Sequence, residues 1–254
     1  MREEPFLGGN LNQAVRVGDT VRRRAGPWTP AVHALLRALE NAGFDAPRVK
    51  GIDRQGREIL GYIPGKTYWE SKDPAPDPAF DERHLVAAAR LLRRYHDIVV
   101  RFSPPADAQW RLVAPTEHEL ICHNDWAPWN ALFRGDRLAL MLDWDLAGPG
   151  SRLWDIANAA YCWAPLISQV RLFGLGERGR RVRLFCDAYG LQDRSQLLPV
   201  MRVRIDHVAR FIEAEARSGD PGFAQLVAWR TPAKMDNDVA YLDEHRAIFE
   251  RALR

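Results

Sequence analysis

The sequence predicts an α+β fold with two lobes, a small N-terminal antiparallel β-sheet lobe with one helix and a larger, mostly helical C-terminal lobe. Short strand patterns separated by turn residues fill the first 65 residues and enclose one amphipathic helical segment, whereas helical patterns dominate from residue 84 onwards. The chain has 254 residues, of which 46% are hydrophobic, so two lobes could each bury a core. We therefore expect an N-terminal lobe over 1–65 and a C-terminal lobe over 66–254, with a cleft between them.

The N-terminal strands are predicted from turn signals. Four strands are expected, in two pairs, over residues 12–17, 20–24, 48–52 and 58–63. Gly18-Asp19 lies between the first two and is typical of a two-residue β-hairpin turn. Residues 53–56 form the turn between the second two, and Pro64-Gly65 ends the strand pattern.

One helix is expected over residues 30–42. Pro30 is a favourable first helical residue, and Gly43 lies just past the end, where glycine is preferred. The apolar residues between them recur at helical spacing, namely Val32, Leu35, Leu36 and Leu39. This helix can therefore cover one face of the N-terminal sheet.

Beyond residue 65 the pattern changes to helices. The segment 71–78 contains three prolines, which exclude a helix and favour a surface connection near the lobe boundary. Residues 84–100 form a strongly amphipathic segment, and the chain from 153 onwards is mostly helical in pattern. The last third, 197–254, has nearly balanced acids and bases, so it predicts helices without a strong charge field.

Charge and hydropathy exclude several classes of protein. The chain has 36 Lys and Arg against 33 Asp and Glu, so its net charge of +3 does not indicate nucleic-acid binding. No apolar run approaches the roughly 18 residues that span a bilayer, and the first five residues lack the apolar stretch of a signal peptide. We therefore expect a cytoplasmic protein that binds neither nucleic acid nor membrane.

The three cysteines give no sign of a disulfide framework. Cys122, Cys162 and Cys186 are odd in number and widely spaced, and they form no C-x-x-C pair. A zinc site is not indicated either. Reduced, mostly buried thiols are expected.

One segment carries residues whose types and spacing indicate chemistry. His123-Asn-Asp-Trp-Ala-Pro-Trp-Asn130 is followed by two strand patterns around Gly135-Asp136 and then by Asp143-Trp-Asp145. A hairpin at Gly135-Asp136 would bring Asn130 opposite residues 141–143. Three oxygen-bearing side chains, those of Asp125, Asn130 and Asp143, should therefore converge.

Oxygen ligands of this kind suit a metal ion together with phosphate. Mg²⁺ is usually held by one or two carboxylates plus substrate phosphates, and an asparagine carbonyl is a suitable further ligand. Asp125 lies five residues before Asn130 and would remain available to accept a proton from a substrate hydroxyl.

The spacing H-x-D-x-x-x-x-N, followed by a hairpin and an aspartate, resembles the catalytic loop of the protein-kinase-like superfamily. More narrowly, this loop together with Met141-Leu-Asp-Trp-Asp145 and Trp154-Asp-Ile-Ala157 resembles the aminoglycoside phosphotransferase and choline kinase family of small-molecule kinases. Tyr95-His96-Asp97 matches the Leu-His-Asp end of the helix that precedes that family's catalytic loop, with Tyr in place of Leu. The resemblance covers residues 85–160 firmly, extends to 7–65, and is weak after 165.

The resemblance implies an enzyme that moves the γ-phosphate of ATP or GTP to a hydroxyl of a small molecule, with Mg²⁺ as cofactor. It implies that Asp125 is the catalytic base and that Asn130 and Asp143 bind the metal. It also assigns nucleotide binding to residues 1–65, the catalytic loop to 121–145, and acceptor binding to helices of the C-terminal lobe.

The nucleotide side departs from the pattern of such kinases. A glycine-rich loop is represented by Gly8 and Gly9, but the sequence is not G-x-G-x-x-G. The next strand offers arginines where a lysine is usual, and strand alternation favours Arg23, with Arg22 in reserve. The helix that should supply a glutamate carries His33 in its first turns, and Glu40 lies two turns too late.

Two further interpretations concern this nucleotide side. Gly61, Tyr62 and Ile63 would form the hinge whose backbone meets the nucleotide base. The alternative for the arginines is a solvated hairpin edge that binds no phosphate, because the usual ion pair is missing.

Other residues of the loop have structural alternatives. We expect His123 to pack the loop rather than transfer protons, and Asp155 to anchor the loop through backbone hydrogen bonds. Asp145 could be a second metal contact, a substrate contact or a solvated carboxylate. Four tryptophans could line a substrate wall or pack beneath the loop: Trp126, Trp129, Trp144 and Trp154.

The expected partners are a nucleoside triphosphate and a small-molecule hydroxyl acceptor, for a protein that is a monomer or a homodimer. An aminoglycoside would need a strongly acidic pocket, of which the last third gives no sign. The alternative function is a kinase-like protein that binds a nucleotide or metabolite with little or no transfer, suggested by Arg23 and His33. Retention of Asp125, Asn130 and Asp143 argues against it.

Overall fold

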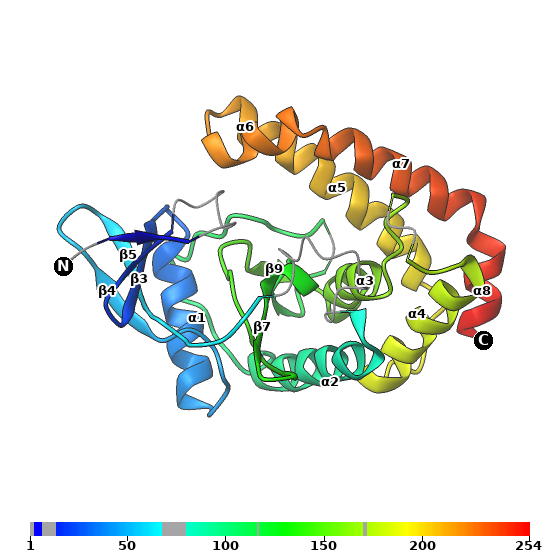
Figure 1. Cartoon of the computed structure of the whole chain (residues 1–254), viewed down its shortest axis with the longest axis horizontal. Coiled ribbons are helices and arrows are strands. Elements are labelled where there is room, and N and C mark those ends of the chain that lie inside the picture. Colours follow the sequence, from blue (N-terminus) through cyan, green and yellow to red (C-terminus); the bar gives the residue numbers. More distant parts are fainter. Residues whose placement is uncertain (1–2, 7–13, 68–79, 116, 170–171) are drawn as a thin grey trace.

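The structure is a computed structural model that describes residues 3–6, 14–67, 80–115, 117–169 and 172–254. The expected connection over 71–78 lies outside these residues. Figure 1 shows a small sheet with one helix at one end of the molecule and a larger group of helices at the other. The α+β fold class is therefore confirmed.

The N-terminal sheet has five strands in the order β1-β2-β3-β5-β4, with antiparallel neighbours throughout. Their bounds are β1 Glu4–Pro5, β2 Val15–Val17, β3 Thr20–Arg24, β4 Val49–Ile52 and β5 Arg57–Gly61. The hairpin at Gly18-Asp19 is confirmed, since Val17 pairs with Thr20. Two details differ from the prediction: β1 was not foreseen, and β5 ends at Gly61, so Tyr62 and Ile63 follow the strand.

Helix α1, Thr29–Asn41, follows β3 and buries the predicted apolar face. Val32, Leu35, Leu36 and Leu39 are all at most 1% exposed and join the core that includes Leu60 of the sheet. The helix ends where Phe44 N donates to Leu39 O and Gly43 adopts a φ of 67°, which only glycine tolerates freely.

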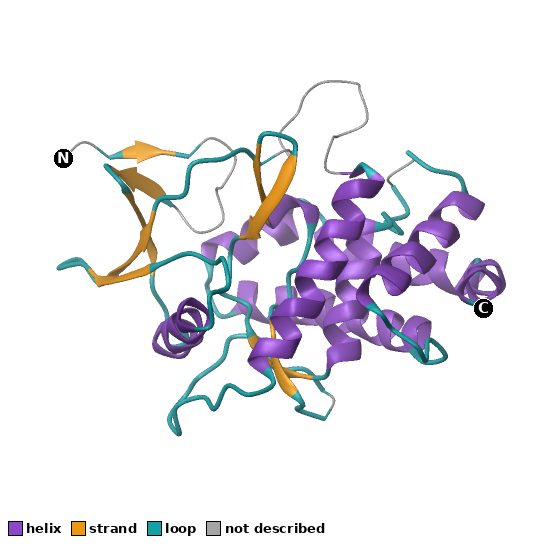
Figure 2. Ribbon diagram, turned by 90° about the horizontal axis from the view of Figure 1, so that it is seen from below, coloured by secondary structure: helices purple, strands orange, loops and turns teal. Residues whose placement is uncertain are grey.

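The C-terminal part is built from seven helices among the described residues, as its pattern predicted. They are α2 Glu82–Val99, α3 Arg152–Trp163, α4 Leu175–Tyr189, α5 Leu197–Arg217, α6 Pro221–Ala228, α7 Thr231–Glu244 and α8 Arg246–Leu253. Figure 2 shows this helical bundle beside the small sheet. Helix α5 lies against α3 on one side and against α6 and α7 on the other.

Two short strand pairs frame the segment with the predicted chemistry. Strand β6, Leu120–Cys122, pairs with β9, Gly148–Gly150, and β7, Ala131–Arg134, pairs with β8, Arg137–Met141. The 3-10 helix η2, Pro128–Asn130, joins the first pair to the second.

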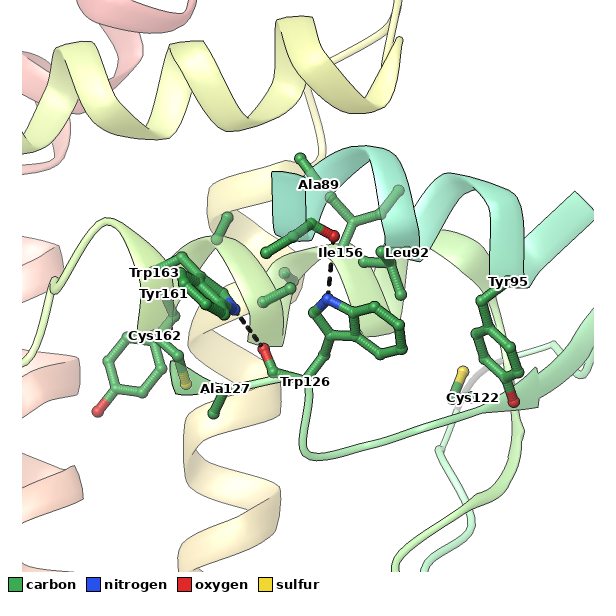
Figure 3. Close-up of a cluster of buried hydrophobic side chains, with 14 of the residues drawn as sticks. Ala89, Leu92, Tyr95, Cys122, Trp126, Ala127, Ile156, Tyr161, Cys162 and Trp163 are labelled. Atoms are coloured by element: carbon green, nitrogen blue, oxygen red, sulfur yellow. Dashed lines mark hydrogen bonds between the residues drawn. The ribbon is translucent and has the colours of Figure 1, made fainter. Parts of the chain in front are cut away.

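A continuous apolar core lies beneath this segment (Figure 3). Trp126 is fully buried there, and its indole Nε1 donates to Ala88 O of α2 at 3.1 Å. Trp163 Nε1 donates in turn to Trp126 O at 3.1 Å. The three cysteines are free and buried, as expected. None of the described helices is long and apolar enough to cross a membrane.

Candidate active site

The β7–β8 hairpin brings the two ends of the chemical segment together. Ala131 pairs with Met141, and Leu142 N donates to Asn130 O at 2.7 Å. Asn130 therefore lies beside the residue that precedes Asp143, as the turn at Gly135-Asp136 predicted. Asp143 has a φ of 56°, a left-handed conformation that is uncommon outside glycine and that concentrates at functional sites.

Asp125 lies at the centre of the site and is held by two side chains. Asn130 Nδ2 donates to Asp125 Oδ2 at 2.7 Å, and Trp129 Nε1 lies 3.2 Å from both carboxylate oxygens. Burial, reinforced by the negative charge of Asp143, raises the pKa of Asp125 to about 6. A carboxylate with a raised pKa is a better proton acceptor than an ordinary aspartate.

The loop that carries Asp125 is anchored from behind by Asp155 of α3. Its carboxylate accepts hydrogen bonds from His123 N at 2.8 Å and Asn124 N at 3.0 Å, and it lies 3.2 Å from His96 Nε2. Burial opposes ionisation, but His96 and His123 together lower the pKa of Asp155. The geometry matches the anchoring role expected for this residue.

His123 is completely buried and both ring nitrogens have backbone partners. Nε2 donates to Leu142 O at 3.1 Å, and Nδ1 accepts from Asp125 N at 3.2 Å. Burial lowers the pKa of the imidazole, although Asp155 and Asp143 oppose that shift. A neutral His123 with hydrogen bonds at both ring nitrogens links the Asp125 loop to the end of β8. This is the structural role that was expected of His123.

Three of the four tryptophans pack beneath the loop. Trp126, Trp144 and Trp154 are at most 1% exposed, and Trp154 Nε1 donates to Asn124 Oδ1 at 3.1 Å. They do not line a substrate wall. Trp129 is half-buried and is the one of the four that contacts Asp125.

Arg23 extends from β3 into this site. Its guanidinium lies 2.9 Å from Asp143 and 2.5 Å from Asp145, and it also pairs with Glu58 of β5. The residue is 6% exposed, so the solvated-edge alternative is wrong for Arg23. Arg22 instead lies 3.7 Å from Asp53. Burial alone would lower the pKa of Arg23, but the three carboxylates raise it.

The sequence interpretation missed Glu58 as a partner of Arg23 and did not decide the position of Asp145. His33 reaches the guanidinium only through Glu58. His33 Nε2 lies 2.9 Å from Glu58 Oε1, and Arg23 donates to the other oxygen of the same carboxylate. The glutamate comes from a strand rather than from α1. A signal existed: if β3 and β5 are neighbours, Arg23 and Glu58 stand directly opposite each other.

Asp145 is buried and forms an ion pair with Arg23, so the solvated alternative is wrong for Asp145. Burial, together with the charges of Asp143 and Glu58, raises the pKa of Asp145 to about 7, although Arg23 opposes this shift.

A buried arginine of α5 was also missed. Arg204 is 3% exposed, and its Nη2 donates to Asn124 O. Asn124 has a φ of 65° and directly precedes Asp125. Position 204 follows Met201 by three residues on the buried face of α5, so the spacing could have indicated that Arg204 is buried, but not that it contacts Asn124.

The predicted hinge begins at Gly61, the last residue of β5, and continues into Tyr62 and Ile63. Gly61 N donates to Arg48 O and Tyr62 N donates to Asp19 O, both at 2.8 Å, so these two amides serve the sheet. The Tyr62 ring lies 3.9 Å from the Arg16 guanidinium. Gly8 and Gly9 lie outside the described residues.

The fit of a metal rests on Asn130 and Asp143. Within the described ranges no group of three or more His, Cys, Asp or Glu side chains is arranged to hold a metal ion. Two oxygen ligands are nevertheless what Mg²⁺ needs from a protein when phosphates and water complete its octahedron. The donor set therefore fits a metal that arrives with a nucleotide.

The fold and this arrangement of aspartates define a class, the kinase-like phosphotransferases. The solved structure of a choline/ethanolamine kinase family protein from Mesorhizobium loti is similar, with a TM-score of 0.61 and 18% identity over 100% of this chain and 91% of that one. An amicoumacin kinase in complex with AMP-PNP, Ca²⁺ and amicoumacin is similar with a TM-score of 0.64 and 11% identity, over 91% of this chain and 87% of that one.

The model of the phosphotransferase enzyme family (APH) matches residues 2–117 and 105–200, and the chain belongs to this family. This membership confirms the small-molecule kinase class that the motifs predicted. A trifolitoxin immunity protein from Rhizobium leguminosarum bv. trifolii is 32% identical over the full length of both chains.

Proposed function

We propose that this protein transfers the γ-phosphate of ATP or GTP to a hydroxyl of a small molecule in an Mg²⁺-dependent reaction. The observation that carries the proposal is the convergence of Asp125, Asn130 and Asp143 through the β7–β8 hairpin. Asp125 accepts the proton of the attacking hydroxyl. Asn130 and Asp143 hold the metal, which neutralises charge on the phosphates.

The nucleotide side is assigned to the N-terminal sheet, residues 1–65. Arg23 contacts the α- and β-phosphates, and a guanidinium is suited to this because its fork can make two hydrogen bonds to phosphate. The backbone of Gly61, Tyr62 and Ile63 meets the base, with the Ile63 amide as the hinge donor, since the other two amides already have partners. Gly8 and Gly9 cover the phosphates. The similar amicoumacin kinase binds AMP-PNP and Ca²⁺, which supports nucleotide and divalent-metal use in this fold.

The acceptor binds among the helices of residues 66–254. Trp129 stands beside the carboxylate of Asp125 and is half-buried, so it is placed to contact the acceptor as well as to orient the base. The acceptor needs a free hydroxyl within hydrogen-bond distance of Asp125.

The proposal is tested by measuring ADP or GDP release with Mg²⁺ across amino sugars, nucleosides and amino alcohols. Asp125→Asn is the inactive reference, with an expected loss of about 10²–10⁴ in rate. Asp136→Asn, an exposed aspartate at the hairpin tip, is the matched control and should keep full activity. Nucleotide binding without transfer to any acceptor would favour the alternative, a binding protein without transfer activity.

A second candidate role is protection against a toxin. It is favoured by one observation, the 32% identity over the whole chain to a trifolitoxin immunity protein. We propose that the acceptor hydroxyl then belongs to the toxin. Expression of the wild type in a trifolitoxin-sensitive strain should raise the inhibitory concentration, and the Asp125→Asn variant should not. Equal protection by both proteins would mean that any immunity does not depend on phosphoryl transfer.

A further inference from the structure

We propose that Glu58 is the positioning residue for the phosphate-binding cation, a task that a strand performs here instead of helix α1. The inference rests on the proposed role of Arg23. It concerns Glu58 and His33, two residues that touch neither the substrate nor the metal in the mechanism proposed above.

The register of the sheet places the pair. Arg23 of β3 stands directly opposite Glu58 of β5, and opposite residues in an antiparallel pair have neighbouring side chains. Glu58 is 1% exposed, so it cannot turn out into water. Although burial opposes it, the charge of Arg23 lowers the pKa of Glu58. The carboxylate is therefore a fixed anion beside the guanidinium.

The pairing uses the rear of the guanidinium. Glu58 Oε2 accepts from Nε, the nitrogen nearest the backbone of Arg23. Nη1 and Nη2 point the other way, toward Asp143 at 2.9 Å and Asp145 at 2.5 Å. Glu58 thus holds the fork from behind and leaves its two outer nitrogens directed at the catalytic segment. A lysine has one nitrogen and cannot separate these two contacts.

His33 fixes the other oxygen of the same carboxylate. Its Nε2 lies 2.9 Å from Glu58 Oε1, and the histidine itself is 6% exposed. Helix α1 therefore contributes to the cation indirectly, through Glu58. With both oxygens engaged, the carboxylate has one orientation, and so does the guanidinium that it holds.

The experiment measures binding of ATP and of adenosine by calorimetry for wild type, Glu58→Gln, Arg23→Met and the double variant. Only ATP carries the phosphates that Arg23 contacts, so the adenosine affinity reports on the integrity of the base site. A charged hydrogen bond is about twice as strong as a neutral one, so Glu58→Gln should weaken ATP binding about fivefold to tenfold and leave adenosine unchanged. Arg23→Met should weaken ATP binding more, by at least about tenfold.

The double variant distinguishes positioning from general structure. If Glu58 acts through Arg23, adding Glu58→Gln to Arg23→Met should change the ATP affinity by less than about twofold, because the pair is coupled. Asp53→Asn is the matched control: Asp53 is a carboxylate of the β4–β5 turn that binds Arg57 at 2.9 Å, and its loss should leave ATP binding unchanged.

Two failures are distinguishable. Unchanged ATP affinity in Arg23→Met would overturn the proposed role of Arg23 itself. Weakened ATP binding in Arg23→Met with normal binding in Glu58→Gln, or an equal loss from Glu58→Gln in both backgrounds, would overturn the positioning role alone. Should Glu58→Gln not fold, His33→Leu tests the same point, since it keeps the carboxylate and frees Oε1; normal ATP binding there would also overturn the inference.

Discussion

The carbonyl oxygen of Asn124 accepts a hydrogen bond from the buried guanidinium of Arg204, a residue 80 positions further along the chain. On the other side of the same peptide group, Asp125 N donates to His123 Nδ1. The peptide that leads into the proposed base is therefore held from both sides. Burial lowers the pKa of Arg204, and within the described residues no carboxylate forms a salt bridge with it.

We expect Arg204→Met to lower the turnover number about tenfold while the affinity for nucleotide stays unchanged, because Arg204 holds the peptide before Asp125 and touches no nucleotide residue. The unfolding free energy should change by less than about 2 kcal/mol, since the lost hydrogen bond is offset by removal of a buried charge. Steady-state kinetics and urea unfolding check both parts. Arg202→Met is the control, because Arg202 is exposed on the same helix and pairs with Asp243 at the surface. A wild-type turnover number in Arg204→Met would refute the assignment.

The metal assignment predicts a graded response to substitution. Asp143→Ala should abolish the Mg²⁺ dependence of ATP binding, because its carboxylate is the charged ligand in the proposed metal site. Asn130→Ala should reduce the Mg²⁺ dependence of ATP binding less than Asp143→Ala does. It should also reduce turnover, because it removes the 2.7 Å hydrogen bond to Asp125. Calorimetric titration of ATP with and without Mg²⁺ measures the difference. An undiminished Mg²⁺ effect in Asp143→Ala would mean that the metal binds elsewhere.

The parts of the site that could be predicted are local in sequence. Asn130 and Asp143 belong to one hairpin, and the two-residue turn at Gly135-Asp136 brings them close, although a bulge between Leu132 and Phe133 shifts the register by one residue. Asp155 was placed correctly as an anchor through a resemblance to a known motif, with no long-range geometry needed.

The parts that could not be predicted depend on pairing between distant segments. Glu58 reaches Arg23 because β5 inserts between β3 and β4 in the sheet, and hydrophobic alternation does not specify that order. Arg204 reaches Asn124 because α5 packs against α3. Nothing in composition separates these two residues from the many Arg and Glu side chains that remain at the surface.

The close approach at Gly148 yields a stability prediction. A Cβ atom at this position would lie 1.9 Å from the Leu112 carbonyl oxygen, and a backbone atom cannot move aside cheaply. Gly148→Ala should therefore destabilise the protein by about 2–4 kcal/mol through steric overlap. Gly176→Ala is the matched control: it lies in α4 with nothing within 4 Å of the added Cβ, and should be neutral or up to about 1 kcal/mol stabilising. Urea unfolding of both variants measures the difference in stability. Equal stability of Gly148→Ala and wild type would contradict the close contact between Gly148 and the Leu112 carbonyl oxygen.

The buried imidazole of His123 yields a prediction about pH. Burial lowers its pKa below the value of about 6.5 that histidine has in the unfolded chain, so between those two values the unfolded state binds more protons. The contribution of His123 to stability is therefore complete above about pH 6.5 and is lost as the pH falls toward the folded pKa, with a slope of up to about 1.4 kcal/mol per pH unit. Protonation of Asp125 and Asp145 acts in the opposite direction over pH 7.5 to 5.5, because their raised pKa values of about 6 and about 7 make the folded state bind more protons there. The contribution of His123 is therefore read as the difference between the wild type and His123→Gln, which retains an amide donor for Leu142 O but has no proton to gain. In urea without Mg²⁺, the unfolding free energy of the wild type should decrease relative to that of His123→Gln as the pH falls from 7.5 to 5.5. Parallel curves for the two proteins would show that protonation of His123 does not affect stability in this interval.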